Sequence, residues 1–309
     1  MQILAGSARI TEPLGPFAVV IGNFDGVHLG HQSLIAEVKR RADADALPML
    51  AYTFHPHPAT VLSRTGGPQL IEPLEQRVER LAEAGFATTL IEPFSTEYAE
   101  ITPEGFLSEI LAHKLQARHV VVGENFRYGN RAAGDVALMR ERGRALGFET
   151  AGMPMVVIDS EPASSTRVRQ ALREGDVALA GKLLGRAFAI TGVVMRGDRR
   201  GSKMGYPTAN VATYNELLPA VGVYAARVGG EFGGHPAVAN IGYAPTFNRT
   251  ELKVEVHLLD FEARPLYGKV FEIEFLEHIR GEQRFESVDG LVAQIHKDVD
   301  AARTILSGG

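Results

Sequence analysis

The chain has 309 residues, 45% of them hydrophobic and 22% charged, which excludes a disordered protein and suffices for two domains that each bury a core. Its formal net charge of −5 gives no general attraction to nucleic acid or to an anionic membrane, so we expect neither as a partner and expect any phosphate binding to be local. The lack of cysteine excludes disulfides, cysteine zinc sites and a thiol nucleophile, and the lack of a signal-type N-terminus or a long apolar run predicts a soluble, cytoplasmic protein. The sequence leaves the oligomeric state open.

The first informative stretch runs from Ala18 to His31. Ala18–Ile21 is a short β-branched apolar run, the pattern of a buried parallel strand, and the residues after it break the strand sharply. Apolar positions from Gln32 to Arg41 recur at helical spacing, so His28 and His31 stand at the opening of a helix. The residues that break the strand are Gly22, Asn23, Phe24, Asp25 and Gly26.

A helix N-terminus favours phosphate oxygens, because it presents unpaired N–H groups and the positive end of the helix dipole. His28 and His31 are spaced i and i+3 and face the same way, so both rings can reach one polyphosphate. Gly30 between them has no Cβ and lets a nucleotide approach the backbone. Two alternatives stay open, a pair of surface histidines or a metal pair completed by Asp25.

Strand and helix patterns alternate up to about residue 172. The strand Leu47–Phe54 ends in a loop with two prolines, residues 55–58, which we interpret as a rigid edge of a site rather than as a metal site. Such alternation predicts a doubly wound parallel sheet with helices on both faces and ligands at the carboxyl ends of the strands. The other predicted strands are Ala87–Ile91, His119–Val122 and Val156–Ile158, and the other predicted helices are Leu74–Ala84, one that opens at Thr102-Pro103, and Val136–Leu146.

A loop of mixed chemistry, residues 123–129, follows the fourth predicted strand. Asn125 can bond a base or a phosphate, and Arg127 can bind an anion. Phe126 and Tyr128 can stack on a ring system. The alternative is an ordinary loop whose aromatic side chains fill the core.

A cluster of hydroxyl and basic side chains opens the helix that follows residue 163. Ser164, Ser165 and Thr166 bring hydroxyl groups to a helix start. Arg167 and Arg169 add positive charge within one turn, which suits a leaving pyrophosphate. An ordinary N-cap is the alternative, and it explains one hydroxyl but neither arginine.

Strands dominate after residue 185, separated by glycine-rich turns at spacings that suit an antiparallel β-barrel. One amphipathic helix, from about Val288 to Ile305, closes the chain. We therefore predict an α/β domain over residues 1–184 and a β-barrel domain closed by a helix over residues 185–309. The strands predicted for the barrel are Phe188–Met195, Gly222–Val228, Ala237–Ile241, Val254–Leu259 and Val270–Phe275.

The barrel half contains a basic glycine-rich loop, residues 197–205, followed directly by residues 206–210. The loop is no Walker A sequence, but its backbone N–H groups could cover phosphates, with a solvated basic turn as the alternative. Thr208 and Asn210 carry oxygen donors that suit a partly hydrated Mg²⁺. The residues assigned to phosphate here are Gly197, Gly201, Lys203, Gly205 and Pro207.

Glu255 is a candidate general base on a strand. It alternates with His257, so the two side chains share one face. A carboxylate in such a place could accept the proton of an attacking hydroxyl. A solvated strand glutamate is the alternative, and the spacing alone does not decide between the two.

These motifs resemble those of a known family. H-x-G-H resembles the signature of the nucleotidylyltransferase superfamily, and GNFDGVHLGH and GENFRYG are similar to motifs of the bacterial-type bifunctional riboflavin kinase/FMN adenylyltransferases, also called FAD synthetases. GYPTAN and VEVHLLDF resemble the riboflavin kinase motifs of that family, so the resemblance covers nearly the whole chain. Ala163 departs from the family pattern, in which isoleucine usually precedes Ser-Ser-Thr, and this concerns local packing more than chemistry.

The resemblance implies an FMN adenylyltransferase domain over residues 1–184, a riboflavin kinase domain over residues 185–309, the substrates ATP, riboflavin and FMN, and Mg²⁺ as cofactor. It implies Glu255 as the base of the kinase and His28 and His31 as catalytic residues of adenylyl transfer. It further implies ATP or phosphate binding by Gly22, Asn23, Phe24, Asp25, Gly30, Asn125, Arg127, Ser164, Ser165, Thr166 and Arg169, flavin binding by Phe54, Pro56, His57, Phe126, Tyr128 and Arg280, and metal binding by Thr208 and Asn210. The alternatives are an adenylyltransferase for another small phosphate ester, with a barrel that only binds flavin or nucleotide, and a flavin- or nucleotide-sensing regulator without turnover.

Overall fold

The structure is a computed structural model that describes residues 1–196, 205–246, 249–262 and 264–308. The chain forms two compact units, Met1–Ala163 and Ser164–Gly309, and each is described by itself. The predicted assignment of residues 1–184 and 185–309 to two activities stays a prediction. Within the described ranges, no helix is long and apolar enough to cross a membrane.

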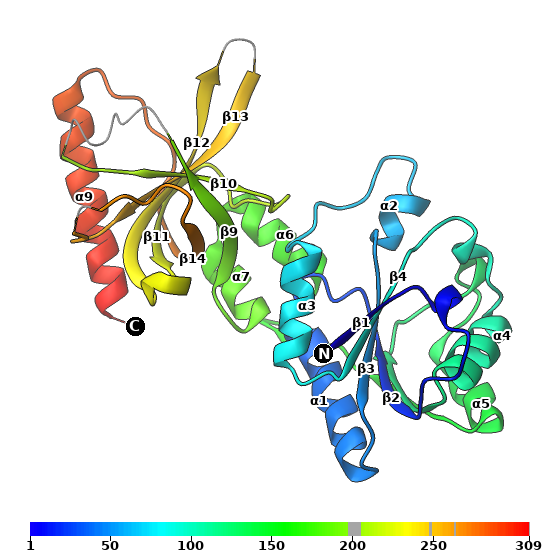
Figure 1. Ribbon diagram of the computed structural model, residues 1–309. Helices are drawn as coiled ribbons and strands as arrows, with labels where there is room; N and C mark the ends of the chain where they lie inside the picture. Colours follow the sequence, from blue (N-terminus) through cyan, green and yellow to red (C-terminus); the bar gives the residue numbers. More distant parts are fainter. Residues whose placement is uncertain (197–204, 247–248, 263, 309) are drawn as a thin grey trace. The chain divides into compact units, whose positions relative to one another are not determined.

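The first unit is built on a six-stranded sheet in the order β1-β4-β3-β2-β5-β6, with every pair parallel (Figure 1). The chain runs from β2 outward to β3 and β4 and then returns to β5 on the other side of β2, which confirms the predicted doubly wound sheet. A separate short ribbon pairs β7 with β8. The strands are β1 (Gln2–Ala5), β2 (Phe17–Ile21), β3 (Met49–Phe54), β4 (Thr88–Glu92), β5 (Ala117–Gly123), β6 (Glu149–Met153), β7 (Val157–Ile158) and β8 (Glu161–Pro162).

Helices cover both faces of this sheet, with α1 and α3 on one face and α4, η3 and α5 on the other (Figure 1). This is the arrangement that βαβ units produce, because each crossover places its helix against the sheet. The helical segments are η1 (Ser7–Arg9), α1 (Leu29–Ala44), α2 (Pro58–Leu62), α3 (Leu74–Glu83), η2 (Tyr98–Glu100), α4 (Pro103–Gly105), the π-helix η3 (Phe106–Lys114), η4 (Asn130–Ala132) and α5 (Val136–Leu146).

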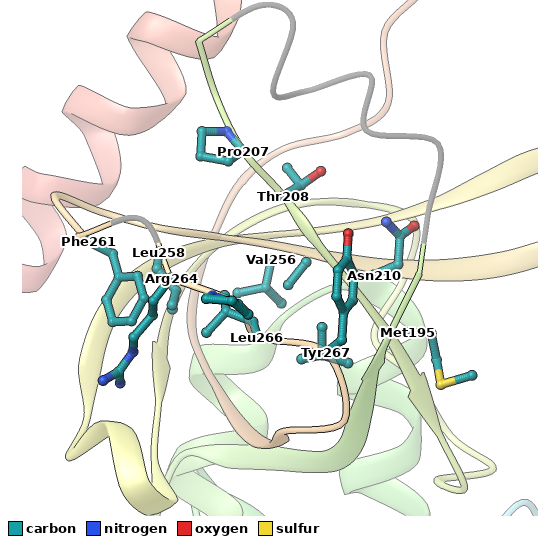
Figure 2. A pocket seen from close by; sticks show the side chains of 13 residues that line it. Met195, Pro207, Thr208, Asn210, Val256, Leu258, Phe261, Arg264, Leu266 and Tyr267 are labelled. Atoms are coloured by element: carbon teal, nitrogen blue, oxygen red, sulfur yellow. The ribbon is translucent and has the colours of Figure 1, made fainter.

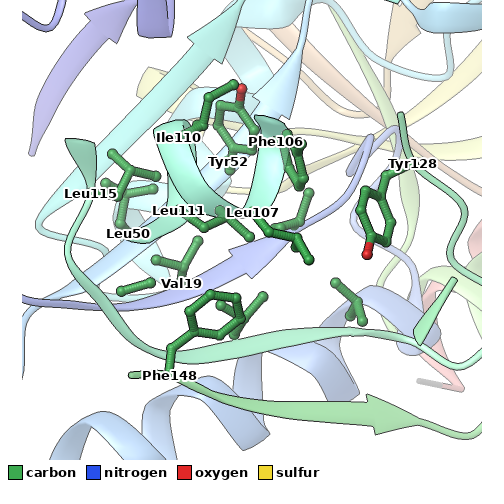
Figure 3. Packing of buried hydrophobic residues seen from close by; sticks show 14 of the residues in the cluster. Val19, Leu50, Tyr52, Phe106, Leu107, Ile110, Leu111, Leu115, Tyr128 and Phe148 are labelled. Carbon is green, nitrogen blue, oxygen red and sulfur yellow. The ribbon is translucent and has the colours of Figure 1, made fainter. Parts of the chain in front are cut away.

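The central strands β2 and β3 are buried along their whole length, because the sheet is covered on both faces. Val19 on β2 lies in the same apolar cluster as Leu107 and Leu111 of η3 (Figure 3). Val20, which points to the opposite face, lies in the cluster that contains Val38 of α1. Each such side chain contributes about 1.5–3 kcal/mol when it is fully buried, so the two clusters fix β2 at the centre of the unit.

Two strands of this sheet, β1 and β6, were not predicted, and one predicted strand lies outside it. β1 and β6 are the two edge strands, and edge strands lack the continuous apolar run of a buried strand, as their mostly exposed or half-buried residues show. The predicted strand Val156–Ile158 lies outside the sheet, because Val157 and Ile158 belong to the β7–β8 ribbon and Val157 is 58% exposed. A short apolar run therefore does not by itself indicate a sheet strand.

The second unit begins with two helices and continues into a closed antiparallel barrel in the order β10-β13-β12-β11-β14-β9, which confirms the predicted barrel. Val254, Val256 and Leu258 are buried, whereas Glu255 and His257 between them are half-buried, so the strands alternate between the interior and the outside. The elements are α6 (Ser165–Glu174), α7 (Val177–Leu184), β9 (Phe188–Met195), β10 (Ala209–Thr213), β11 (Gly222–Val228), η5 (Gly230–Phe232), β12 (His235–Thr246), β13 (Arg249–Leu258), β14 (Val270–Arg280) and α9 (Val288–Ser307).

The closing helix α9 packs on the outside of the barrel, where its Val299 and Ala302 form a cluster with Ala225 and Leu259 (Figure 1). This helix agrees with the predicted one to within a few residues. The barrel has one strand that was not predicted, β10, because polar residues interrupt its apolar pattern and a proline stands just before it. β10 carries Asn210, so the missed strand belongs to a predicted site.

Candidate active sites

The H-x-G-H segment and the loop 123–129 leave the sheet at neighbouring points. The first follows β2 and the second follows β5, and these two strands pair in parallel, with Val20 beside Val121. The strand order reverses between them, and ligands bind at such a reversal, outside the carboxyl ends of the strands. Both predicted nucleotide-binding segments therefore lie at the edge of the sheet where binding is expected.

His28 and His31 lie together at the start of α1. His28 is the N-cap, and its Nδ1 accepts the backbone N–H of Gly30 at 3.1 Å. The two imidazole rings stack with their centroids 3.8 Å apart. Because Nδ1 of His28 is an acceptor, the proton of the neutral ring is on Nε2, which can donate to a phosphate oxygen.

The environment of His31 favours its neutral form. Burial lowers the pKa of the His31 imidazole well below 6.5, and the nearby charges of His28 and Arg77 lower it further. Nδ1 of His31 is buried and has no hydrogen-bond partner among the described residues. At pH 7, His31 can therefore offer a phosphate a hydrogen bond but not a full positive charge.

An aromatic ring lies against each of Gly22 and Gly30 and leaves little room for a side chain at either position. A Cβ at position 30 would lie 2.9 Å from Cε1 of His28, and a Cβ at position 22 would lie 3.1 Å from the ring of Phe24. The space at Gly30 that was expected to admit a nucleotide is filled by the His28 ring. The roles of both glycines in binding ATP stay predictions.

The turn between β2 and α1 begins with half-buried residues and continues with buried ones. The side-chain amide of Asn23 lies 3.2 Å from Nε2 of His57, so the structure brings together residues from the ends of β2 and β3. Phe24 and Asp25 are fully buried, and the Asp25 carboxylate accepts the N–H of Ile71 at 2.9 Å. In the part of the chain that is described, no group of three His, Asp or Glu side chains could hold a metal ion, so the metal alternative with Asp25 has no support.

The three predicted flavin residues at the end of β3 have different surroundings. Phe54 is buried in the core and contacts the ring of Phe94, with centroids 5.8 Å apart. Pro56 is exposed. His57 is the N-cap of α2, and its Nδ1 accepts the N–H of Ala59 at 3.1 Å. Of the three, Phe54 is the least accessible to a ligand, and a flavin role for any of them stays a prediction.

The loop after β5, residues 123–129, contains both exposed and buried side chains. Asn125 and Arg127 are exposed, and Arg127 donates to Asp135 at 3.2 Å. Tyr128 is buried and stacks with Phe126, and burial is the main reason that its pKa rises to about 12. Tyr128 therefore fits the core-filling alternative, whereas the exposed amide of Asn125 and guanidinium of Arg127 can meet a ligand.

The Ser-Ser-Thr cluster forms the start of α6. Ser164 is the N-cap, and its hydroxyl accepts the N–H of Arg167 at 3.2 Å. Ser165, Thr166 and Arg169 follow within the first two turns. α6 belongs to the second compact unit, so its predicted approach to the histidines of the first unit stays a prediction.

One end of the barrel contains a cavity of about 200 Å³ (Figure 2). Thr208 and Asn210 lie at its edge and offer a hydroxyl and an amide oxygen, the hard donors that Mg²⁺ prefers. Gly205, with a φ of 86°, comes just before this segment, whereas Gly197, Gly201 and Lys203 lie outside the described residues. The cavity is lined by Val194, Met195, Pro207, Thr208, Ala209, Asn210, Val256, Leu258, Phe261, Arg264, Pro265, Leu266 and Tyr267.

Glu255 lies directly opposite Asn210 in the pairing of β13 with β10, and opposite Asn240 in the pairing of β13 with β12. Directly opposed residues share a face, so the side chains of Asn210, Glu255 and Asn240 form a row across β10, β13 and β12. Of the three, Asn210 also lines the cavity. Asn240, Arg264 and Tyr267 had no predicted role in a site. Strand register, which no single motif contains, identifies Asn240, whereas Arg264 and Tyr267 reach the cavity through the loop between β13 and β14.

Two contacts hold the segment that carries Thr208. The hydroxyl of Tyr206 hydrogen-bonds Nδ1 of His296 on α9, and Nδ1 of His257 lies 2.8 Å from the carbonyl oxygen of Pro207, to which it donates. The ring of Tyr206 also packs edge-on against both imidazoles. The donors at Thr208 are thereby tied to α9 and to the strand of Glu255.

Arg280, a predicted flavin residue, is an ion-pair partner of α9. Its Nε and Nη2 donate to the Asp298 carboxylate at 2.7–3.0 Å, and its Nη1 donates to the carbonyl oxygen of Gly281. Gln294 donates to the same carboxylate. Arg280 therefore joins the end of β14 to α9, and contact with a flavin stays a prediction.

Comparison with known proteins gives matches over both halves of the chain. The family model for FAD synthetase matches residues 11–167, and the model for riboflavin kinase matches residues 184–306. The bifunctional riboflavin kinase/FMN adenylyltransferase of Escherichia coli K12 is 37% identical over 306 residues, which cover 98% of this chain and 97% of that protein. The enzyme of the same name from Bacillus subtilis 168 is 38% identical over 305 residues, which cover 95% of this chain and 93% of that protein.

A solved structure matches nearly the whole chain. The crystal structure of a protein named as a macrolide-efflux protein from Streptococcus pneumoniae has a TM-score of 0.88 and 31% identity, and the match covers 98% of this chain and 99% of that one. The two family models and the full-length relatives cover both the unit with the parallel sheet and the unit with the barrel. The chain belongs to the family of bifunctional riboflavin kinases/FMN adenylyltransferases.

Proposed function

We propose that the two activities of this family reside in the two sites described above. The barrel transfers the γ-phosphoryl group of ATP to the ribityl hydroxyl of riboflavin and produces FMN. The site at His28 and His31 then transfers AMP from a second ATP to FMN, which produces FAD and pyrophosphate. The main support for this proposal is that His28 and His31 lie in one compact unit, whereas Thr208, Asn210 and Glu255 lie in the other.

In the kinase step, the Glu255 carboxylate accepts the proton of the ribityl hydroxyl as its oxygen bonds to the γ-phosphorus and the bond to ADP breaks. Asn210, opposite Glu255, places the phosphate end of ATP within reach of this base. Thr208 and Asn210 would hold Mg²⁺, which neutralises charge on the phosphate oxygens when it is bound. The neighbouring cavity is where we place the rest of the nucleotide.

In the adenylyl step, a phosphate oxygen of FMN attacks the α-phosphorus of ATP, and the bond to pyrophosphate breaks. No covalent enzyme intermediate is needed, so catalysis consists of positioning and charge stabilisation. Nε2 of His28 and the imidazole of His31 donate to the phosphate, and the start of α1 adds its N–H groups. The family resemblance assigns the leaving pyrophosphate to Ser165, Thr166 and Arg169.

Product analysis tests this assignment. The protein is incubated with riboflavin, ATP and Mg²⁺, and flavins are separated by chromatography at intervals. We expect FMN to appear first and FAD to follow. Formation of no FMN, with AMP transfer to a different phosphate ester, would favour the adenylyltransferase with a binding barrel. Tight flavin binding without any product would favour the sensing regulator.

A further inference from the structure

Charged side chains are buried around the turn between β2 and α1. Asp25 and Arg77 are fully buried and Glu72 is 3% exposed. Asp25 was predicted to bind ATP or phosphate, whereas Glu72 and Arg77 had no predicted role. Burying charges is expensive, and replacing a buried ion pair by well-packed apolar residues often leaves stability unchanged or improves it. The presence of such groups beside a predicted catalytic turn therefore suggests a role other than stability.

Arg77 of α3 connects two strand ends. Its Nη1 donates to the carbonyl oxygen of Phe54, the last residue of β3, at 3.3 Å. Its Nη2 lies 4.0 Å from Oδ1 of Asp25 in the turn that follows β2. A planar guanidinium can serve both partners at once, which a lysine ammonium at the same place cannot do with the same geometry.

The segment before α3 holds the same turn in a second way. The N–H of Ile71 donates to Asp25 at 2.9 Å, and the N–H of Gly26 donates to Glu72 at 3.2 Å. Arg80 of α3 donates to the other oxygen of Glu72 at 2.9 Å. The turn and the segment at the start of α3 thus each donate to a carboxylate of the other.

The turn needs this support because its backbone is strained. Phe24 and Val27 have φ values of 51° and 39°, a region that bulky and β-branched residues rarely adopt. Strain of this kind persists only where the surrounding structure enforces it. Val27 directly precedes His28, so a relaxed turn would move the first histidine of the site.

We propose that Arg77 is a positioning residue for adenylyl transfer, which fixes the strained turn through Asp25 and thereby places His28 and His31 for the reaction. The inference rests on the function proposed above. Arg77 touches neither substrate nor the reacting atoms in this scheme. It also lies close enough to be one of the groups that lower the pKa of His31, after burial and His28.

The test uses Arg77→Met, which keeps an unbranched, mostly apolar side chain but removes the guanidinium and its charge, and Arg77→Lys, which keeps the charge but not the planar guanidinium. FAD formation from supplied FMN and ATP is measured in the full chain, with kcat and the KM for ATP determined separately. Arg41→Met is the matched control, because Arg41 is in the last turn of α1 and pairs there with Glu37 and Glu149. Riboflavin kinase activity of every variant reports on the other unit.

We expect Arg77→Met to lower kcat for FAD formation by about 10- to 100-fold with less than about a threefold change in the KM for ATP, since misplaced groups cost rate rather than binding. Arg77→Lys should recover part of kcat, and Arg41→Met should match the wild type. Wild-type kcat in Arg77→Met would overturn the inference, as would an equal loss in Arg41→Met. If circular dichroism shows Arg77→Met unfolded, Arg77→Lys decides, and wild-type kcat in that variant would overturn it. A wild-type protein that forms no FAD would instead refute the proposed function.

Discussion

Glu255 is the residue whose role can be isolated most cleanly. Glu255→Gln keeps the shape of the side chain opposite Asn210 and one of its acceptor oxygens but removes the ability to accept a proton. General base catalysis typically contributes 10²- to 10⁴-fold, so we expect FMN formation from riboflavin to fall by at least about 100-fold. Chromatography of the flavins measures this, and FAD formation from supplied FMN serves as the control. FMN formation within tenfold of the wild-type rate would refute the role of Glu255 as base.

The lowered pKa of His31 predicts how the free energy of unfolding depends on pH. The folded state lowers the pKa of this imidazole, so below pH 6.5 the unfolded state binds the proton more strongly than the folded state does. Stability contributed by the neutral ring is therefore complete above pH 6.5 and is lost as the pH falls, by up to about 1.4 kcal/mol per pH unit. Other groups titrate in the same range, so the comparison requires a variant that lacks this proton site.

His31→Gln is that variant, because glutamine keeps a polar side chain of similar size and does not titrate. Urea unfolding followed by circular dichroism at pH 7.5 and pH 5.5 gives the free energy of unfolding of the first transition in each protein. We expect the wild type to lose more stability than His31→Gln between the two pH values. Equal losses would show that the His31 pKa is not lowered by folding.

At the scale of elements, the segment before β10 depends on its contacts with α9 and β13. Tyr206→Phe removes the hydroxyl that bonds His296 but keeps the ring that packs against His257. A hydrogen bond of this kind contributes about 1 kcal/mol, so we expect the KM for ATP in the kinase reaction to rise about fivefold as Thr208 is held less firmly. Steady-state kinetics test this, with FAD formation from FMN as the unaffected reaction. A KM within twofold of the wild-type value would mean that α9 does not position this segment.

The elements that the sequence predicted well are those with a strong period or a clear cap. α5 spans Val136–Leu146, as the pattern predicts, because Asp135 caps it and Gly147 ends it in a left-handed conformation. The strands that were missed are the edge strands β1 and β6 and the polar strand β10. Half-exposed strands carry no continuous apolar run, and their identity comes from neighbours that are distant in sequence.

The same limit applies to the candidate sites. The motifs predict His28 and His31 at the start of a helix, and the structure has them there. This could be predicted because a strand, a turn and a helix cap are local features of the sequence. The pairing of Glu255 with Asn210 joins residues 45 positions apart and depends on strand register. The contact of Arg77 with Asp25 likewise depends on how α3 packs, so no motif around Asp25 could predict it.

At the scale of the whole molecule, the two proposed sites predict activities that mutation can separate. Glu255→Gln should leave FAD formation from FMN intact, and the double variant His28→Ala/His31→Ala should leave FMN formation from riboflavin intact. Neither protein alone should convert riboflavin into FAD. This reciprocal pattern follows because one set of residues lies on the parallel sheet and the other on the barrel, in units with separate cores.

Mixing the two variants tests the separation directly. Each supplies the activity that the other lacks, so a mixture given riboflavin, ATP and Mg²⁺ should form FAD after a lag in which free FMN accumulates. The lag should shorten as the concentration of Glu255→Gln rises, because that protein consumes the FMN released by its partner variant. If the mixture forms no FAD while each variant retains its own single activity, FMN must stay on the chain that makes it. If either variant alone forms FAD from riboflavin at the wild-type rate, its altered residues are not part of the reaction assigned to them.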